Sequence, residues 1–338
     1  MDFSLIICTY MRPEPLRVLL ESIGPQTKYP SEILIIDGST NDQTRDMLVQ
    51  NRFEAISYHK VPDEHRGLTR QRNFGIARVS KSSEVVCFLD DDTILEPTYF
   101  EELLKTYSIF PEAIAAGGYI TNEIQWTKVD EKYSPTTSEF AFDAWKRKDG
   151  SRYILRKKLH LDTDKDPGFA PDFSNGRSIG FLPPSGKIYE VEQIMGGVSS
   201  FRAKVFETLN FSTYFEGYGL YEDADFSYRL LPYGKLFVNT AARLEHHHAP
   251  SGRPNQYRYG KMVVRNGWYV WRVRTPKPSF KAKIKWHAIA LLLASVRATN
   301  AIFGKSNKKQ AFTESVGRFV AYFELFFNKP SAPRTDKS

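Results

Sequence analysis

The sequence is poor in cysteine and in long apolar runs. Cys8 and Cys87 are its only cysteines. Both lie inside short apolar runs that we interpret as neighbouring core strands, so we expect buried free thiols and not a disulfide. Free thiols fit a reducing cytosol. Near the C-terminus, residues 286–296 form an apolar segment of 11 residues, whereas a helix that crosses a bilayer needs about 20. We therefore expect this segment to be too short to cross.

Three further features are missing. No basic region followed by a long apolar stretch stands at the N-terminus, so we see no secretory signal and expect a cytoplasmic location. No Gly-rich phosphate loop follows the first apolar run, residues 4–10, which argues against a nucleotidyltransferase. Residues 1–275 show no recognised nucleic-acid-binding motif and no concentrated basic stripe, so we expect no nucleic-acid partner.

The composition is that of a globular protein. With 41% hydrophobic and 25% charged residues, the chain is neither intrinsically disordered nor a polytopic membrane protein by composition. Its 338 residues suit one large α/β domain or one domain with an appendage, and we favour the second. A net charge of +8 favours anionic partners, which include nucleic acid, phospholipid surfaces and nucleotide diphosphates. The charge alone does not choose among them.

Apolar runs and helical patterns alternate along the first part of the chain. Apolar runs without internal alternation are typical of parallel strands covered on both faces. The expected strands are 4–10, 32–37, 55–60 and 84–89, and the expected helices are 14–23, 43–51 and 68–79. Right-handed βαβ units in one parallel sheet are the economical outcome. The sequence therefore predicts an α/β fold.

Three consecutive carboxylates, Asp90, Asp91 and Asp92, follow the strand expected at 84–89. Ligands of α/β sheets bind at the carboxyl ends of parallel strands, which is where these acids lie. If the pleat continues, Asp90 and Asp92 share a face and Asp91 points away. Two convergent carboxylates suit a hard divalent cation, Mg²⁺ or Mn²⁺, that bridges them to substrate phosphates. A solvated acidic turn is the alternative.

Polar residues also follow the second strand and open the third helix. Asp37 ends the strand 32–37, where its carboxylate can accept a hydrogen bond from the ring N–H of a nucleobase. For Asp42, in the next turn, we expect a helix-capping role. Arg70 and Arg72 lie at the start of the helix 68–79, where positive charge opposes the helix dipole, so a nearby phosphate is a reasonable partner.

Two histidines follow a further apparent strand late in the chain. Alternation places His246 and His248 on one face, where either can complete a metal shell or contact a diphosphate. The alternative is that both histidines are structural.

The ordered set of motifs closely resembles the family 2 glycosyltransferases, whose fold is GT-A. The resemblance covers roughly residues 3–275 and rests on Thr9-Tyr10, Asp37, Gly67-Leu68 with Arg72-Asn73, Asp90-Asp91-Asp92, Gly196-Gly197 and Glu222-Asp223. It implies a Rossmann-like, mostly parallel central sheet flanked by helices. One departure is Gln71, where the family commonly has a small residue, which leaves the packing of that helix open.

The resemblance also implies how a nucleotide-sugar is held. Thr9, Tyr10 and Asp37 inherit contacts with the nucleoside. Asp90 lies near the ribose or the metal ion, and Asp92 coordinates the metal ion on the diphosphate. Arg72 inherits a contact with the nucleotide. We add Arg12 and Asp91, neighbours of these motifs, to the nucleotide-sugar site, and His246 and His248 to the candidate metal ligands.

The Glu222-Asp223 pair resembles the acceptor-side motif of the family. Inverting transfer is an in-line displacement that needs a base opposite the departing diphosphate. Asp223 resembles the residue with that task, and Glu222 resembles a residue that positions acceptor or donor. The alternative is an exposed acidic helix start, which the helix dipole favours by itself.

These inferences give an expected division of the chain and a set of partners. The expected parts are a GT-A catalytic domain at 1–275, with a nucleotide-sugar-binding part at 1–125, an insertion at 131–190 and an acceptor-side part at 190–275, and a basic, aromatic helical extension at 276–338. We expect Mn²⁺ or Mg²⁺ as cofactor, a nucleotide-sugar donor, and a polysaccharide, oligosaccharide or lipid-linked acceptor. The C-terminal helices either bind the inner face of the membrane peripherally, pack on the catalytic domain or form an oligomer interface. The alternative function is a non-catalytic nucleotide-sugar or glycan-binding protein on a degenerate GT-A fold.

Overall fold

A computed structural model describes residues 1–215, 217–248, 255–304 and 307–331. The chain forms two compact units, each made of two chain segments. The first unit comprises Met1–Trp126 and Ile179–Gly252, and the second comprises Thr127–Ser178 and Arg253–Ser338. All of the expected site residues lie in the first unit.

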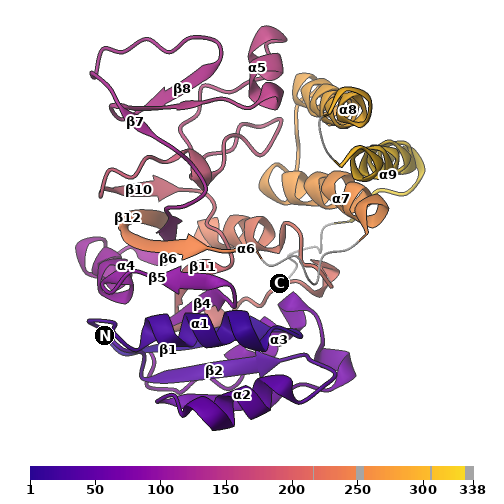
Figure 1. Ribbon diagram of the computed structural model, residues 1–338. Helices are drawn as coiled ribbons and strands as arrows, with labels where there is room; N and C mark the ends of the chain where they lie inside the picture. Colours follow the sequence, from indigo (N-terminus) through magenta and orange to yellow (C-terminus); the bar gives the residue numbers. More distant parts are fainter. Residues whose placement is uncertain (216, 249–254, 305–306, 332–338) are drawn as a thin grey trace. The chain divides into compact units, whose positions relative to one another are not determined.

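A nine-stranded sheet forms the centre of the first unit (Figure 1). Its strands are β1 (Phe3–Thr9), β2 (Glu32–Asp37), β3 (Ile56–Lys60), β4 (Val85–Asp90), β5 (Thr93–Leu95), β6 (Ala113–Ile120), β10 (Ile188–Val191), β11 (Val198–Arg202) and β12 (Lys235–His246). The order is β10-β12-β6-β11-β4-β1-β2-β3, and β5 pairs with β12. The run β4-β1-β2-β3 is parallel, as is the β6-β12 pair, whereas β11 is antiparallel to both of its neighbours.

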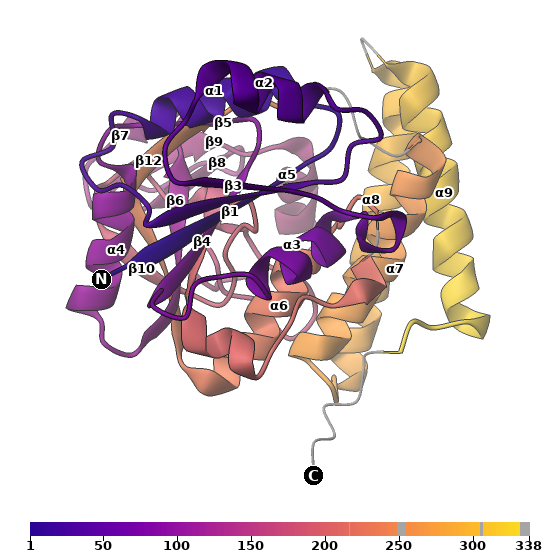
Figure 2. The same cartoon turned by 90° about the horizontal axis from the view of Figure 1, so that it is seen from below.

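Helices cover both faces of this sheet. They are α1 (Pro13–Ile23), α2 (Gln43–Asn51), α3 (Leu68–Ile76), α4 (Tyr99–Ile109) and α6 (Glu222–Leu230), with short 3₁₀ turns at Asp63–His65, Ile179–Phe181, Ala203–Glu207, Thr213–Phe215 and Leu231–Tyr233. The apolar stripe of α1 packs with one face of β1, β2 and β4. On the other face α3 approaches so closely that a Cβ at Gly75 would touch Ile6 and Ile36. Figure 2 shows α1 and α2 on one side of the strands and α3 on the other.

The expected fold class is confirmed, including the α/β alternation at the start of the chain. The expected strands and helices up to residue 90 are all present, with α3 ending at Ile76, three residues before the expected end. Cys8 and Cys87 are free and lie on the neighbouring strands β1 and β4. The open question at Gln71 is answered by its buried side-chain amide, which donates to the carbonyl oxygens of Thr9 (3.1 Å) and Ile36 (2.8 Å). It thereby ties α3 to β1 and β2.

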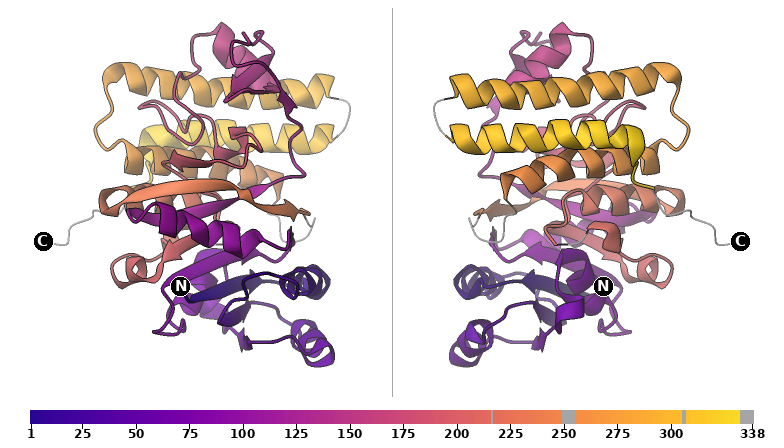
Figure 3. Two further views of the ribbon diagram at one scale, coloured as in Figure 1. Left: turned by 90° about the vertical axis from the view of Figure 1, so that its left-hand side faces the viewer. Right: turned by 90° about the vertical axis from the view of Figure 1, so that its right-hand side faces the viewer.

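The second unit contains a small sheet and a group of helices. The sheet has the order β7-β9-β8, formed by Thr127–Lys128, Trp145–Lys148 and Glu139–Phe142, and α5 (Ser151–Lys158) follows it. The long helices are α7 (Gln256–Arg274), α8 (Phe280–Phe303) and α9 (Lys308–Phe327). Figure 3 shows α8 and α9 running side by side. Trp268, Trp271, Trp286, Tyr322 and Leu325 form the core between these helices.

These units divide the chain differently from the expected scheme. The segment expected as an insertion, 131–190, contributes its residues up to 178 to the same unit as the C-terminal helices. The helix α7, which the scheme places inside 1–275, also belongs there, because Val264, Trp268 and Trp271 pack with α8 and α9. Composition does not reveal this grouping, since α7 mixes basic and aromatic residues much as its neighbours do.

The apolar segment near the C-terminus is part of a helix that is longer than we expected. The apolar residues 286–296 are the middle of α8, which has 24 residues. Within the described parts of the chain, α8 is the one helix that is long and apolar enough to cross a membrane by length and composition alone. Core helices of soluble proteins can have the same length and apolar composition, so these two properties do not by themselves indicate a membrane span.

Candidate active site

The candidate site lies where parallel strands of the first unit end. Thr9 of β1 pairs with Asp37 of β2, and Cys8 of β1 pairs with Asp90 of β4, so these carboxyl ends meet at one edge of the sheet. The loops after β1 and β4 add Arg12, Asp91 and Asp92. β12 ends beside them at His246. This is the edge at which ligands of α/β sheets bind.

Asp91 faces β1 and is held by two side chains. The Thr9 hydroxyl donates to its Oδ2 over 2.7 Å, and Arg12 Nη1 donates to its Oδ1 over 3.0 Å. The same Arg12 nitrogen lies 3.3 Å from Asp92 Oδ2. Burial raises the pKa of Asp91 to about 6, although Arg12 and Thr9 oppose the shift. Asp91 is thus a buried anchor for the loop that carries Arg12. β4 ends at Asp90, so the expected alternation does not extend to Asp91 and Asp92, and Arg12 contacts both of them.

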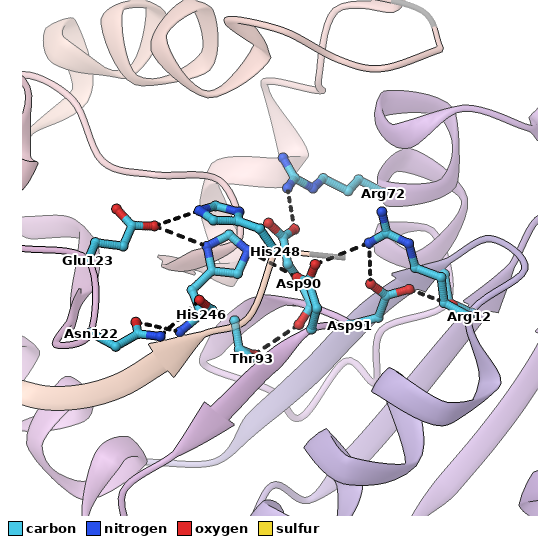
Figure 4. Close-up of polar contacts among 11 residues, drawn as sticks. Arg12, Arg72, Asp90, Asp91, Thr93, Asn122, Glu123, His246 and His248 are labelled. Carbon is cyan, nitrogen blue, oxygen red and sulfur yellow. Dashed lines mark hydrogen bonds and ion pairs between the residues drawn. The ribbon is translucent and has the colours of Figure 1, made fainter. Parts of the chain in front are cut away.

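Asp90, Asp92 and His246 form a group that can hold a cation. Figure 4 shows Asp90 and His246 of this group. One potential ligand atom from each lies within 4.8 Å of the others, and His246 Nε2 is 3.0 Å from Asp92 Oδ1. Burial lowers the pKa of His246, but hydrogen bonds to Asp92 and Glu123 outweigh it and raise the pKa to about 10. Two carboxylates and one imidazole suit Mn²⁺ well and Mg²⁺ through the carboxylates. The residues present therefore fit a divalent metal ion.

A buried ion pair, Arg72 with Glu222, lies behind this group. Arg72 Nη1 is 2.6 Å from Glu222 Oε1, and its Nη2 is 3.8 Å from Asp90 Oδ1. Burial raises the pKa of Glu222 to about 8, although Arg72 opposes the shift. Gly196 and Gly197 are required here, because a Cβ at either position would collide with the Glu222, Arg72 or Asp90 side chains. The Gly-Gly motif thus allows two acids and an arginine to approach a loop backbone.

Asp223 is the second residue of α6 and follows Glu222 of this pair. Its Oδ2 accepts a hydrogen bond from the Gly196 backbone N–H over 3.4 Å, and its Oδ1 accepts one from the Ala224 N–H over 2.8 Å. Burial raises the pKa of Asp223. Because Gly196 also neighbours Glu222, and Gly197 approaches Asp90, the structure brings the expected base close to the expected metal ligands.

Two residues expected near the nucleoside, Tyr10 and Asp37, differ in accessibility. Tyr10 is exposed, whereas Asp37 is fully buried and accepts hydrogen bonds from the Ser39 N–H (2.7 Å) and the Tyr58 hydroxyl (2.9 Å). Asp42 was expected to cap α2. That expectation is wrong among the described residues: Asp42 stands at the N-cap position, but its carboxylate pairs with Lys60 at 2.6 Å. The Asp42 carboxylate pairs with the Lys60 ammonium group and does not accept a hydrogen bond from a backbone N–H at the start of α2.

Of the two expected histidine ligands, only His246 belongs to the group with Asp90 and Asp92, and the structure adds residues that sequence reasoning missed. His248 belongs to a second group of potential metal ligands with Glu123 and His246. Asn122 exchanges two hydrogen bonds with the His246 backbone, at 3.0 and 3.1 Å. Asn122 and Glu123 follow β6, which pairs in parallel with β12. The signal available in the sequence was the apolar run 113–120, which ends two residues before Asn122.

Comparison with known proteins supports the fold and the family. The structure resembles a mannosyltransferase of Pyrobaculum calidifontis in complex with GDP-Man and Mn²⁺, with a TM-score of 0.56 and 14% identity over 97% of this chain and 88% of that one. At this identity the likeness concerns the fold alone, which is the GT-A fold.

Two curated relatives are glycosyltransferases. A glucosyl-dolichyl phosphate glucuronosyltransferase of Haloferax volcanii is 32% identical over 141 residues, which are 40% of this chain and 42% of the relative. An uncharacterized glycosyltransferase of Bacillus subtilis, YwdF, is 25% identical over 191 residues, 56% of this chain and 58% of the relative. The matched parts are thus less than two thirds of either relative. The sequence profile of Glycosyl transferase family 2 matches residues 4–174, half of the chain. The chain therefore belongs to glycosyl transferase family 2.

Proposed function

We propose that this protein transfers a sugar from a nucleotide-diphosphate donor to a hydroxyl group of a polysaccharide, oligosaccharide or lipid-linked acceptor, with inversion at the anomeric carbon. The observation that carries the proposal is the convergence of Asp90, Asp92 and His246 with Asp223 at the carboxyl edge of the sheet. Such an arrangement combines a cation site for a diphosphate with a base for the acceptor. The matched relatives carry glycosyltransferase names, which supports the reaction class.

In this proposal Asp90, Asp92 and His246 hold Mn²⁺ or Mg²⁺. When bound, the ion supplies positive charge that stabilises the leaving diphosphate. Mn²⁺ and GDP-Man are bound in the P. calidifontis enzyme of the same fold. Arg12 contributes a further positive charge beside Asp92, at 3.3 Å. Thr9 and Asp91 act on the donor through Arg12, while the exposed Tyr10 lies at the nucleoside end and the buried Asp37 holds the Ser39 backbone there.

Asp223 is the proposed general base. It takes the proton of the acceptor hydroxyl while the acceptor oxygen bonds to the anomeric carbon and the bond from that carbon to the diphosphate breaks. A carboxylate with a raised pKa is a better base at neutral pH than an exposed one, and burial raises the pKa of Asp223. Glu222, paired with Arg72, positions that arginine behind Asp90.

The test is a donor screen. Purified protein is incubated with UDP-, GDP- and dTDP-sugars, an acceptor extract and Mn²⁺ or Mg²⁺, and the released nucleoside diphosphate is measured. We expect release with one donor class, dependent on acceptor, and the product linkage should have the opposite anomeric configuration to the donor. Donor binding without turnover under any combination would favour the non-catalytic alternative, and a retained configuration would overturn inversion.

We also propose that the second unit contacts an anionic membrane surface peripherally. Many side chains of α8 and α9 are both apolar and exposed: Phe280, Ile284, Ile302, Phe303, Phe312, Phe323, Phe326 and Phe327. Lys281 and Lys283 are exposed next to Phe280. Aromatic side chains flanked by lysine are typical of helices that lie in a membrane interface.

Point variants suit this question better than truncation, because α9 contributes Tyr322 and Leu325 to the core of the unit. Phe323→Ser with Phe327→Ser should reduce sedimentation with anionic liposomes and leave the oligomeric state unchanged. If liposome binding stays the same while light scattering shows a smaller assembly, this apolar surface is an interface between copies of the chain.

A further inference from the structure

A second group of potential metal ligands lies beside the proposed donor site. Glu123, His246 and His248 each offer one ligand atom within 4.8 Å of the others. Glu123 Oε1 is 2.9 Å from His248 Nε2 and 3.6 Å from His246 Nδ1. The two imidazole centroids are 4.1 Å apart. Figure 4 shows the Glu123 carboxylate facing both rings.

The backbone around this group is held in place. His246 ends β12, and Asn122 binds both its N–H and its carbonyl oxygen. The His247 N–H donates to the Asp92 carbonyl oxygen over 2.8 Å. Alternation along the chain sends the His247 ring to a different partner, Glu245, at 2.8 Å. The segment therefore presents His246 and His248 together and keeps His247 apart.

The ligand types and distances fit a cation of the zinc class. Ligands at about 2.0–2.2 Å from a tetrahedral Zn²⁺ lie about 3.3–3.5 Å from one another. The distances from Glu123 Oε1 to the two imidazole nitrogens, 2.9 and 3.6 Å, lie on either side of that value. Two imidazoles and one carboxylate favour Zn²⁺ and similar transition metals over Mg²⁺, which prefers oxygen ligands. Three protein ligands leave a position for water, as at open zinc sites.

His246 is shared between the two groups through its two ring nitrogens. Its Nε2 faces Asp92 at 3.0 Å, and its Nδ1 faces Glu123 at 3.6 Å. A neutral imidazole has one nitrogen with a free lone pair, and the other carries a proton. When Nε2 binds a cation, Nδ1–H donates to Glu123. When Nδ1 binds a cation, Nε2–H donates to Asp92. Each state satisfies both nitrogens, so the two groups exclude each other as cation sites.

We propose that Glu123, His246 and His248 form a second metal site that takes a zinc-class cation, and that its occupation withdraws His246 from the Asp90-Asp92 site. The first half of this inference is independent of the enzyme's reaction. The second half rests on the proposed function, because it makes the second site a metal-controlled inhibitor of the donor site.

The first experiment measures Zn²⁺ binding to the metal-depleted full chain, by competition with a chromogenic zinc chelator. Loss of a residue that hydrogen-bonds a metal ligand costs about 10–100-fold in metal affinity, so loss of a ligand itself should cost at least about tenfold. We expect this loss for His248→Ala and for Glu123→Gln. The matched control is His247→Ala, which should bind Zn²⁺ as the wild type does. Asp90→Ala should also retain Zn²⁺.

The second experiment measures Mn²⁺ binding from the paramagnetic resonance signal of free Mn²⁺, with and without Zn²⁺. In the wild type, Zn²⁺ should release bound Mn²⁺. In His248→Ala, Mn²⁺ should bind as in the wild type, and Zn²⁺ should release at least about tenfold less of it at equal concentration. No donor or acceptor is needed, so failure of the transferase proposal leaves this result interpretable.

Three outcomes would overturn the inference. Zn²⁺ bound equally by the wild type and by folded His248→Ala would place the cation elsewhere. Zn²⁺ bound to the wild type no better than to the Glu123→Gln, His248→Ala double variant would exclude the site. Mn²⁺ and Zn²⁺ bound together without competition would exclude the exchange at His246. Circular dichroism of each variant verifies that the fold is retained.

Discussion

Each unit of the molecule contains buried carboxylates beside arginines, and their environments differ. In the second unit, Asp149 is buried between Arg177 at 2.9 Å and Lys157 at 2.7 Å. Burial alone would raise its pKa, but these hydrogen bonds outweigh it and hold the pKa of Asp149 below its usual value. In the first unit burial prevails, and the pKa values of Asp91, Glu222 and Asp223 are all raised.

The difference separates a structural ion cluster from a functional one. Arg177 also pairs with Asp162 at 2.6 Å, so acids and bases in this cluster balance each other. The site in the first unit has more acids than bases, and its carboxylates gain from additional positive charge or from a proton. Clustered carboxylates with raised pKa values are typical of functional sites. The candidate site thus has an excess of acids that an added cation would offset, whereas Asp149 and Asp162 are matched by Arg177 and Lys157.

The largest effect is expected at the proposed metal site. Asp92→Ala, or chelation by EDTA, should reduce turnover below detection. The substitution removes a carboxylate that holds the cation beside the diphosphate, and EDTA removes the cation itself. Added Mn²⁺ or Mg²⁺ should restore the chelated wild type and not the variant. The measurement is nucleoside diphosphate release with the identified donor. Full activity of the wild type in EDTA would contradict a metal-dependent site.

The next effect tests the base. Asp223→Asn keeps the side-chain shape and removes its ability to accept a proton, so transfer should fall by about 10²–10⁴-fold. Donor affinity, measured by calorimetry with metal present, should change little, because the variant keeps Asp90 and Asp92 and its amide oxygen can still accept one of the two backbone N–H bonds. Transfer near the wild-type rate in a folded Asp223→Asn protein would exclude this residue as the base.

The sequence predicted the first half of the sheet and the main acids of the site, for a physical reason. β1, β2 and β4 are continuous apolar runs that end in polar residues, so both their type and the edge at which they end can be inferred locally. The contribution of Glu123 depends on the pairing of β6 with β12, strands more than a hundred residues apart. Such non-local pairing leaves no local pattern. The grouping of 127–178 with the C-terminal helices was missed for the same reason.

A smaller effect concerns the stability of the second unit. Asp149→Asn leaves Arg177 buried with one acid in place of two, and loss of one partner of a buried pair costs about 3–5 kcal/mol. We expect the low end, because Asp162 remains. Four of the five tryptophans lie in this unit, at 145, 268, 271 and 286, so urea unfolding followed by tryptophan fluorescence reports on it. If Asp149→Asn lowered the free energy of unfolding by less than about 1 kcal/mol, the ion cluster around Arg177 would not stabilise the unit as a buried cluster does.

The smallest effect, a difference in pH dependence, tests the comparison most directly, and Asp225 of the first unit is the matched residue. It is fully buried and pairs with Arg229 at 2.8 Å. Burial nevertheless raises its pKa, although Arg229 opposes the shift. Asp149 has a lowered pKa, so its contribution to stability is present above pH 3.8, the usual value, and is lost as the pH falls below it.

For Asp225 the sign is reversed. Its pKa in the folded protein exceeds the unfolded value, so the folded protein loses stability from this group as the pH rises through the interval between the two. Replacing Asp149 by Asn should therefore flatten the loss of stability in acid below pH 3.8. Protonation of Asp225 stabilises the folded protein as the pH falls toward 3.8, and Asp225→Asn removes this contribution. The variant should therefore lose stability more steeply than the wild type as the pH falls toward that value. Urea midpoints measured by circular dichroism between about pH 3 and 7 distinguish the two slopes. If stability changed with pH equally steeply in the two variants, the pKa values of Asp149 and Asp225 would not be shifted in opposite directions, and the proposed difference between the two units would be wrong.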